Sequence, residues 1–96
     1  MARTYRLEPA ARRELDAYLV WLDEHSTAAA TRFVGAVENA LDVLVSGAAD
    51  GRLVTLTDGR RVRRWYVRPL VVYYLRQGDE VLVLHAHHQA RRPLEP

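Results

Sequence analysis

Apolar residues follow a helical period in the first half of the chain and a strand-like pattern after Gly59. Between residues 9 and 46 they recur three and four positions apart, which is the spacing along one face of an α-helix. After Gly59 they alternate or run continuously, as they do in half-buried and fully buried β-strands. Helices followed by strands indicate an α+β fold, in which a helical hairpin packs on an antiparallel sheet.

Two helices account for the helical part of the chain. The first is predicted from Pro9 to about Glu24, because Pro suits the first helical position. Ser26 and Thr27 are good N-cap residues for a second helix, and Gly47 marks its end. Since few residues separate the helices, they should form an antiparallel hairpin whose apolar stripes belong to the core.

The strands complete the order β-α-α-β-β-β. They are expected at Thr4–Leu7, Arg61–Val67, 70–75 and 80–87. The stretch "LVVYYL" at 70–75 is continuously apolar, which predicts a strand buried on both faces. A turn-rich loop lies before the second of these strands and has room for a further short strand at 52–56.

Composition limits the class of protein. The chain has 96 residues, which predicts a single domain spanning residues 1–96 with a thin core. It contains no cysteine, so disulfides and thiolate metal sites are excluded. No run of 18 apolar residues occurs, and the start "MARTYRLEPA" lacks the apolar region of a signal peptide. We therefore expect a cytoplasmic protein without a membrane partner, and no motif indicates a cofactor.

The charge is unevenly distributed, although the net charge is only +2. Residues 1–46 contain five Arg and seven acids, whereas residues 47–96 contain nine Arg and five acids. All 14 cations are Arg, whose planar guanidinium binds phosphate and carboxylate in a bidentate way. GC-rich coding bias is the simpler explanation of an all-Arg inventory, so the positions of the arginines are more informative than their number.

The stretch "GRRVRRWYVRP" contains no acid and five arginines: Arg60, Arg61, Arg63, Arg64 and Arg68. Strand alternation places Arg61, Arg63 and Trp65 on one face and the other three arginines on the opposite face. Arg beside Trp and Tyr suits a polyanion with stackable bases, and it equally suits an acidic protein partner. An edge strand can also be charged only to prevent aggregation, and the residues leave these three interpretations open.

Three histidines end the last strand, in "VLVLHAHHQARRP". Alternation predicts one face with Val81, Val83, His85 and His87, and the other with Leu82, Leu84, Ala86 and His88. The strand is therefore expected to end in polar side chains, and Arg91 and Arg92 add positive charge just after it.

The histidines admit three interpretations. Metal chelation by His85 and His87 lacks a third ligand, and no acid lies nearby in the sequence to orient the imidazoles. General acid–base catalysis suits imidazole, and it would use His85 or His88, with Arg63 stabilising a developing phosphate charge. Half-buried, hydrogen-bonded strand residues are the third interpretation. The acids of the first helix, Glu14 and Asp16, are expected to be solvated because residues two apart point in different directions.

Taken together, four segments resemble the RelE/ParE superfamily of bacterial toxins in order and spacing. "YRLEPAARREL" resembles the family's opening strand and helix start, and "ATRFVGAVENALDVL" resembles its second helix. "GRRVRRW" resembles the start of a family strand, with Arg63 as the best match to a recurring Arg. "VVYYLRQGDEVLVLHAHHQARRP" resembles the family's final hairpin, which closes in a histidine followed by an arginine.

The resemblance implies a RelE/ParE-like fold and a toxin of a type II toxin–antitoxin system. ParE-type members, which the chain resembles better at His88 and Arg91, poison DNA gyrase and are not enzymes. RelE-type members act with the ribosome as mRNA endonucleases, and in this alternative Arg63, His85 and Arg91 would be catalytic. The chain has no Lys and no Tyr beyond Tyr74, residues that RelE-type members use, so the resemblance favours the gyrase inhibitor.

Either branch implies a cognate antitoxin, a small protein with a DNA-binding N-terminus and a partly disordered acidic tail. A further possibility is a member without toxic activity that only binds a partner in transcriptional autoregulation. The residues expected to bind the target or the antitoxin are Arg61, Arg63, Arg64, Trp65, His88, Arg91 and Arg92. Neither a cofactor nor a metal is expected.

Overall fold

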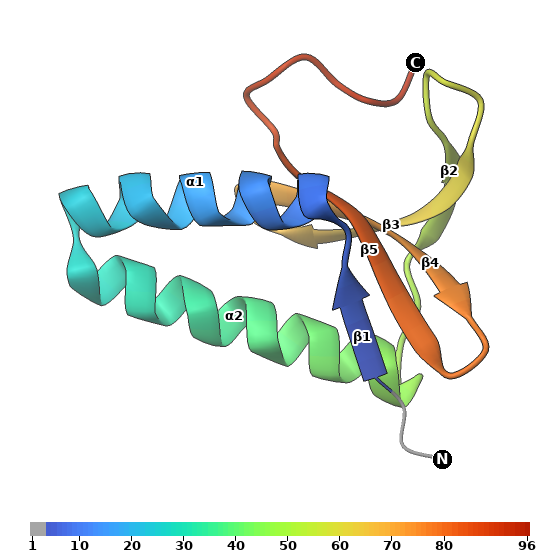
Figure 1. Ribbon diagram of the computed structural model, residues 1–96, viewed down its shortest axis with the longest axis horizontal. Helices are drawn as coiled ribbons and strands as arrows, with labels where there is room; N and C mark the ends of the chain where they lie inside the picture. The colour runs from blue at the N-terminus through green and yellow to red at the C-terminus, as the bar shows by residue number, and fades with distance from the viewer. Residues whose placement is uncertain (1–3) are drawn as a thin grey trace.

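A computed structural model describes residues 4–96, with two helices and five strands (Figure 1). The elements are β1 (Thr4–Leu7), α1 (Pro9–His25), α2 (Thr27–Ser46), β2 (Arg52–Thr55), β3 (Arg61–Val67), β4 (Leu70–Gln77) and β5 (Glu80–His88). The expected α+β class and order are therefore confirmed, and the short strand for which the loop had room is β2. Within residues 4–96, neither helix combines the length and apolarity needed to span a bilayer.

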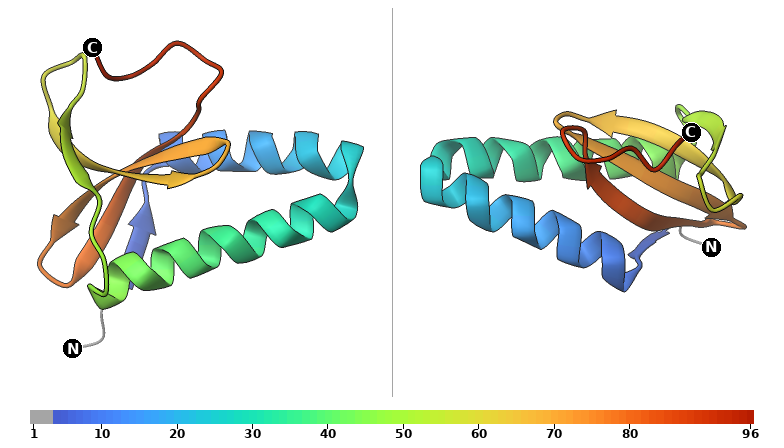
Figure 2. Two further views of the ribbon diagram at one scale, coloured as in Figure 1. Left: turned by 180° about the vertical axis from the view of Figure 1, so that it is seen from behind. Right: turned by 90° about the horizontal axis from the view of Figure 1, so that it is seen from above.

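Local sequence explains the helical hairpin. Pro9 occupies the first turn of α1, and Ser26 caps α2 by accepting a 3.1 Å hydrogen bond from the Ala29 amide. Gly47 ends α2 with φ 77°, a left-handed conformation that costs glycine little. The end of the hairpin that contains the connection between α1 and α2 extends beyond the sheet (Figures 1 and 2).

The five strands form one sheet in the order β1-β5-β4-β3-β2. Strands β2 to β5 pair antiparallel with their neighbours, as expected, whereas β1 pairs parallel with β5. The pairing with β1 covers only the first half of β5, from Glu80 to Val83. The second half of β5 therefore has an edge that no strand covers among the described residues.

Side chains on the two faces of the sheet form two separate clusters. The helix-facing cluster consists of Ala11, Phe33, Leu41, Leu44, Val67, Leu70, Val72, Tyr74, Val81, Val83 and Ala86. The far-face cluster consists of Leu56, Val62, Val71, Tyr73, Leu82 and Leu84. Strand β4 contributes to both clusters, and its residues from Leu70 to Tyr74 are buried, which confirms the predicted strand buried on both faces.

The far face is covered by the C-terminal segment (residues 89–96) and not by a helix. Leu94 packs against the far-face cluster, and its carbonyl accepts a 2.7 Å hydrogen bond from the Thr57 amide. The segment runs from the end of β5 to the hairpin between β2 and β3 (Figure 2). The protein thus closes its second apolar face with loops.

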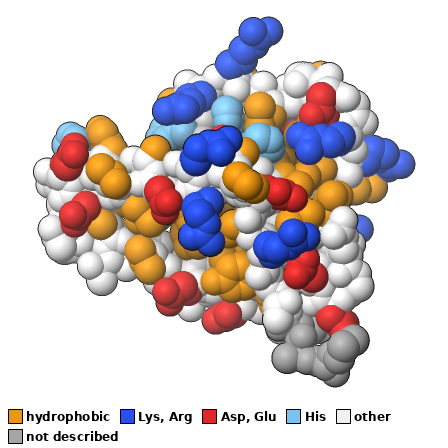
Figure 3. All heavy atoms as spheres, in the orientation of Figure 1, with side chains coloured by type: hydrophobic (Ala, Val, Ile, Leu, Met, Phe, Trp, Pro, Cys, Tyr) orange, Lys and Arg blue, Asp and Glu red, His pale blue; other side chains and the backbone are white. Residues whose placement is uncertain are grey.

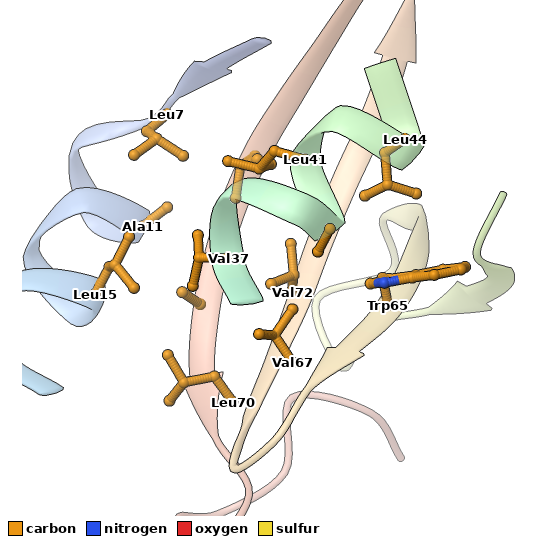
Figure 4. A pocket seen from close by; sticks show the side chains of 13 residues that line it. Leu7, Ala11, Leu15, Val37, Leu41, Leu44, Trp65, Val67, Leu70 and Val72 are labelled. Carbon is orange, nitrogen blue, oxygen red and sulfur yellow. The ribbon is translucent and has the colours of Figure 1, made fainter. Parts of the chain in front are cut away.

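A small apolar cavity lies between the helical pair and the sheet (Figure 4). Its free volume is about 20 Å³, which is room for about one water molecule. Leu15, Val37, Leu41 and Val72 line it, and Trp65 of β3 lies at one side. Because the cavity is small and its lining is apolar, we regard it as a packing gap in the core and not as a binding site.

A β-bulge changes the faces of β5. Leu84 is an extra residue opposite the junction of Tyr73 and Tyr74 in β4. The predicted alternation, which put Ala86 and His88 on the face of Leu84, is therefore wrong. Ala86 packs in the helix-facing cluster, and the His88 ring contacts a side chain of α1. This shift places His88 beside the helical hairpin.

Candidate functional site

The arginines of β3 lie on opposite faces of the sheet, as alternation predicts. Arg63 lies on the helix side, where its Nε is 3.3 Å from Asp50 Oδ2. Arg64 lies on the far face, where its guanidinium donates to Glu95 Oε1 at 2.7 Å. Arg61 is exposed, and it forms no ion pair with another residue of the described chain. Two of these three cations are thus already paired within the protein.

Asp50 is the centre of a hydrogen-bonded network behind Arg63. The Tyr74 hydroxyl donates to Asp50 Oδ1 and accepts from the Gly51 amide at 2.6 Å. Arg76 donates to Asp50 at 3.3 Å and to a carbonyl in the last turn of α2 at 2.8 Å. Arg63 completes the network by donating to the Gly51 carbonyl at 2.8 Å. The network therefore ties β3 and β4 to the segment that follows α2.

The network also sets two protonation states. Burial alone would raise the pKa of Asp50, but hydrogen bonds from Tyr74 and Arg76 and the charge of Arg63 outweigh it and lower this pKa. Burial and the hydrogen bond to Asp50 raise the pKa of Tyr74 to about 12. At neutral pH the carboxylate is therefore charged and the phenol is neutral.

Arg61 and Arg63 line one hollow at the surface, together with Asp50 and Arg76, and we call it the basic hollow. Its free volume is about 430 Å³. Three guanidinium groups face one carboxylate there, so the hollow keeps a net positive charge. An anionic group of a partner would be favoured at this position.

On the far face, Arg64 belongs to a row of cationic and aromatic side chains. The Tyr66 ring lies between two guanidinium groups, with centroid distances of 5.1 Å to Arg64 and 4.8 Å to Arg68. Glu95 accepts from Arg64 and from the Tyr73 hydroxyl, each at 2.7 Å. The hydrogen bond to Glu95 raises the pKa of Arg64, and burial followed by the same carboxylate raises the pKa of Tyr73. The predicted site residue Arg64 is therefore held by the C-terminal segment.

The histidines of β5 lie close to an acidic residue of α1 that is distant from them in the sequence. Glu14 of α1 lies at the uncovered edge of β5, where Oε1 is 2.9 Å from His85 Nδ1 and accepts from the Ala86 amide at 3.3 Å. Its other oxygen is 3.6 Å from His87 Nδ1. The prediction that Glu14 is solvated, and that no acid orients these histidines, is wrong; Asp16 is exposed as expected. A helix carboxylate thus closes the edge that β1 leaves free.

His88 and Arg91 line a second and larger hollow beside α1, with a free volume of about 470 Å³. We call it the aromatic groove, and Glu14, Ala17, Tyr18, Trp21, Leu70, Ala86 and Ala90 also line it. The Tyr18 ring is 5.7 Å from His88 and 6.0 Å from Trp21, and Trp21 is 51% exposed. The groove offers aromatic surface with a cation at its margin, which is suited to an amphipathic segment of a partner.

Sequence reasoning missed Trp21 as a candidate binding residue. The sequence does contain one indication that Trp21 is exposed, because this residue lies outside the apolar stripe of the first helix. A large aromatic residue outside that stripe is exposed unless another element covers it. Tyr18 contributes to both the helix-facing cluster and the groove.

The structure distributes the predicted binding residues over three places. Arg61 and Arg63 line the basic hollow, Arg64 lies on the far face, and His88 and Arg91 line the aromatic groove. Trp65 is half-buried against the helix-facing cluster, and Arg92 is exposed in the C-terminal segment. The predicted residues therefore do not form one contiguous patch.

The three residues of the nuclease alternative have different neighbours, although Glu14, the partner of His85, also lines the aromatic groove. Arg63 is bound to Asp50 in the basic hollow, His85 is bound to Glu14 at the edge of β5, and Arg91 lines the aromatic groove. Within residues 4–96, no hydrogen bond or ion pair joins any two of them. In the same residues, no three His, Cys, Asp or Glu side chains are grouped so that they could hold a metal ion.

Surface charge gathers around the histidines. In Figure 3, histidine side chains lie above α1 in the upper middle of the face, with arginine side chains on both sides. Acidic side chains on this face lie mainly along the helices and the lower margin. Cationic side chains therefore lie close to the histidines on this face, and others are spread over its middle and right side.

Comparison with known proteins places the chain in a family. A search of curated proteins found no match. The sequence model of the family described as "ParE toxin of type II toxin-antitoxin system, parDE" matches residues 5–93, from β1 into the C-terminal segment. The match spans nearly the whole chain, and the observed order of helices and strands agrees with the RelE/ParE-like fold. The chain therefore belongs to the ParE toxin family and is a toxin of a type II toxin–antitoxin system.

Proposed function

We propose that this toxin inhibits DNA gyrase by binding, without catalysing a reaction, and that its cognate antitoxin neutralises it. The observation that supports this proposal is that no hydrogen bond or ion pair joins Arg63, His85 and Arg91 within residues 4–96. A nuclease needs its acid, its base and its phosphate-binding cation within reach of one reacting group. Separate cationic and aromatic surfaces fit recognition of a macromolecule better than chemistry on a bond.

The aromatic groove is the surface that we assign to recognition first. Arg91 supplies a cation, His88 a polar ring, and Tyr18 and Trp21 a broad apolar surface. Aromatic residues and Arg are the side chains that contribute most to protein interfaces. A partly disordered acidic antitoxin segment that folds on binding would gain apolar burial in the groove and charge pairing at Arg91.

Expression in bacteria tests the proposal. Cells that express the toxin alone should stop growing and accumulate broken DNA, because a gyrase poison traps the cleaved enzyme–DNA intermediate. Co-expression of the cognate antitoxin should restore growth. Cleavage of ribosome-bound mRNA, without DNA breaks, would instead establish the nuclease alternative and refute the proposal.

Point variants connect the phenotype to the groove. Arg91→Ala should weaken both growth arrest and antitoxin binding, because it removes the cation of the groove. Arg32→Ala on α2 is the matched control, since Arg32 is exposed and lies outside the groove. Equal toxicity of the two variants would contradict a role of Arg91 in recognition.

A further inference from the structure

The C-terminal segment binds the far face of the sheet through two adjacent residues, Leu94 and Glu95. Leu94 packs on the far-face cluster, and its carbonyl accepts from the Thr57 amide at 2.7 Å. The Glu95 carboxylate accepts from the Arg64 guanidinium and from the Tyr73 hydroxyl, each at 2.7 Å. The protein therefore contains a site that binds an aliphatic side chain, a backbone carbonyl and a carboxylate in succession.

Arg64 and Tyr73, which bind the Glu95 carboxylate, are largely shielded from solvent when the segment is in place. Side chains of Arg64 and Glu95 are only 19% and 22% exposed, and Tyr73 is buried. A charge-assisted hydrogen bond in such surroundings is stronger than one at an open surface. Without a carboxylate, Arg64 and the Tyr73 hydroxyl would lose these partners beneath an exposed apolar patch, which is unfavourable. An occupant with a carboxylate is therefore favoured at this site.

The rest of the segment lies at the surface, and its contacts are with residues near the end of β5 and with the turn between β3 and β4. Residues 89–93 are exposed. The contacts that tether them are a 2.7 Å approach between His87 Nε2 and the Arg92 carbonyl, a 3.2 Å hydrogen bond from Arg68 to Gln89, and backbone and ring contacts near His88. Two adjacent residues thus supply the docking contacts on the far face, and the chain that leads to them lies at the surface. A segment held in this way can be exchanged for another peptide.

The surroundings favour an acidic replacement. Tyr66 is exposed and lies between Arg64 and Arg68, so the cationic row continues along β3 beyond Glu95. Arg68 has a neutral partner, Gln89, and no ion pair with another of residues 4–96. A peptide with a second acid near its Leu–Glu pair would use a charge that the protein's own segment leaves uncompensated.

We propose that the far face is a peptide-docking site for an extended acidic segment of a partner protein, in which an aliphatic residue precedes a carboxylate. The partner segment replaces residues 93–96 and reproduces the contacts of Leu94 and Glu95. The site lies on the side of the sheet opposite the aromatic groove, and the inference does not depend on which target the toxin inhibits. One protein can therefore bind partners on both faces.

A peptide titration tests the site directly. The probe is a capped acidic peptide with a central Leu-Glu pair, added to the full chain and followed by calorimetry and by the amide NMR signals of Thr57 and Tyr73. In the variant Leu94→Ala/Glu95→Gln, the protein's own segment no longer competes. The apparent dissociation constant should then fall by about tenfold or more relative to the unmodified protein, because the free site is more populated. Glu38→Gln on α2 is the charge-matched control and should leave binding unchanged.

Specificity is tested by changing each side of the Arg–carboxylate contact. Adding Arg64→Gln to the double variant, or replacing Glu by Gln in the peptide, should abolish binding. The single variant Glu95→Gln should show a smaller shift in the same direction, and it serves as the test if thermal melting shows that the double variant is unfolded. Equal affinity of the double variant and the unmodified protein, binding that survives Arg64→Gln, or no binding to any variant would each overturn the proposal. Toxicity is not the readout, so failure here is distinct from failure of the gyrase proposal.

Discussion

Replacing Gly51 by alanine should destabilise the protein strongly, because the backbone of β3 passes directly over this residue. A Cβ atom at Gly51 would overlap the carbonyl oxygen of Arg64 and lie 2.9 Å from its carbonyl carbon. It would also lie 3.0 Å from the Tyr74 hydroxyl, which the Gly51 amide now contacts at 2.6 Å. These neighbours are backbone and a buried phenol, so neither can move aside cheaply.

The size of the effect follows from two contributions. Overpacking in a closely packed site costs about 1–3 kcal/mol, and a disturbed buried hydrogen bond costs about 1–3 kcal/mol. The two costs overlap, so we expect a loss of about 3 kcal/mol in the free energy of unfolding. For a domain of this size, each 1 kcal/mol corresponds to roughly 4–8 °C in Tm, so Tm should fall by roughly 10–25 °C.

Gly35→Ala is the matched control for the same chemical change. Gly35 lies within α2, and a Cβ atom there would meet nothing within 4 Å among the described residues. Alanine in a helix interior is favoured over glycine by about 1 kcal/mol, so this variant should be more stable and melt roughly 4–8 °C higher. The two substitutions should therefore shift Tm in opposite directions.

Thermal unfolding followed by circular dichroism, with urea titration at one temperature, measures both variants. The reasoning is refuted if Gly51→Ala melts within a few degrees of the unmodified protein, or if Gly35→Ala is the less stable variant. Either result would mean that the approach of β3 to the segment after α2 differs from the one described.

Three further predictions concern the same network and the helical hairpin. Tyr74→Phe should lower the free energy of unfolding by about 1–3 kcal/mol in urea titration, because the Gly51 amide and the Asp50 carboxylate lose a partner. Folding lowers the pKa of Asp50, so this carboxylate stabilises the folded state at pH values above the ordinary carboxyl pKa of about 4. The stabilisation is lost as the pH falls through the lower pKa that Asp50 has in the folded protein. Asp50→Asn should accordingly differ most from the unmodified protein near neutral pH and converge with it in acid; a constant difference would contradict this assignment. Ser26→Ala should cost about 1 kcal/mol, because the Ala29 amide loses its cap, and an unchanged urea midpoint would exclude that cap.

Local sequence predicted most elements because their signals are local. The boundaries of β1 and β3 agree with prediction, and α1 extends one residue beyond it. Ser26 and Gly47 mark the ends of α2 through conformational preferences that each residue expresses by itself. The continuous apolar run of β4 likewise indicated burial on both faces without knowledge of what covers them.

Contacts between distant residues could not be predicted in this way. Glu14 and His85 are 71 positions apart, and only the packing of α1 across the edge of β5 brings them together. Asp50 lies in a loop that carried no functional signal, yet it binds Arg63 and Arg76. The bulge at Leu84 depends on the register with β4, so simple alternation assigned the later residues of β5 to the wrong face.

Inhibition of DNA gyrase can be measured in a supercoiling assay with purified gyrase and purified toxin. The toxin should inhibit supercoiling in a dose-dependent way and trap cleaved DNA, and antitoxin added in equal amount should prevent both effects. Arg91→Ala should require more toxin for the same inhibition, whereas Arg32→Ala should not. Full supercoiling activity at a large molar excess of folded toxin would show that gyrase is not its target.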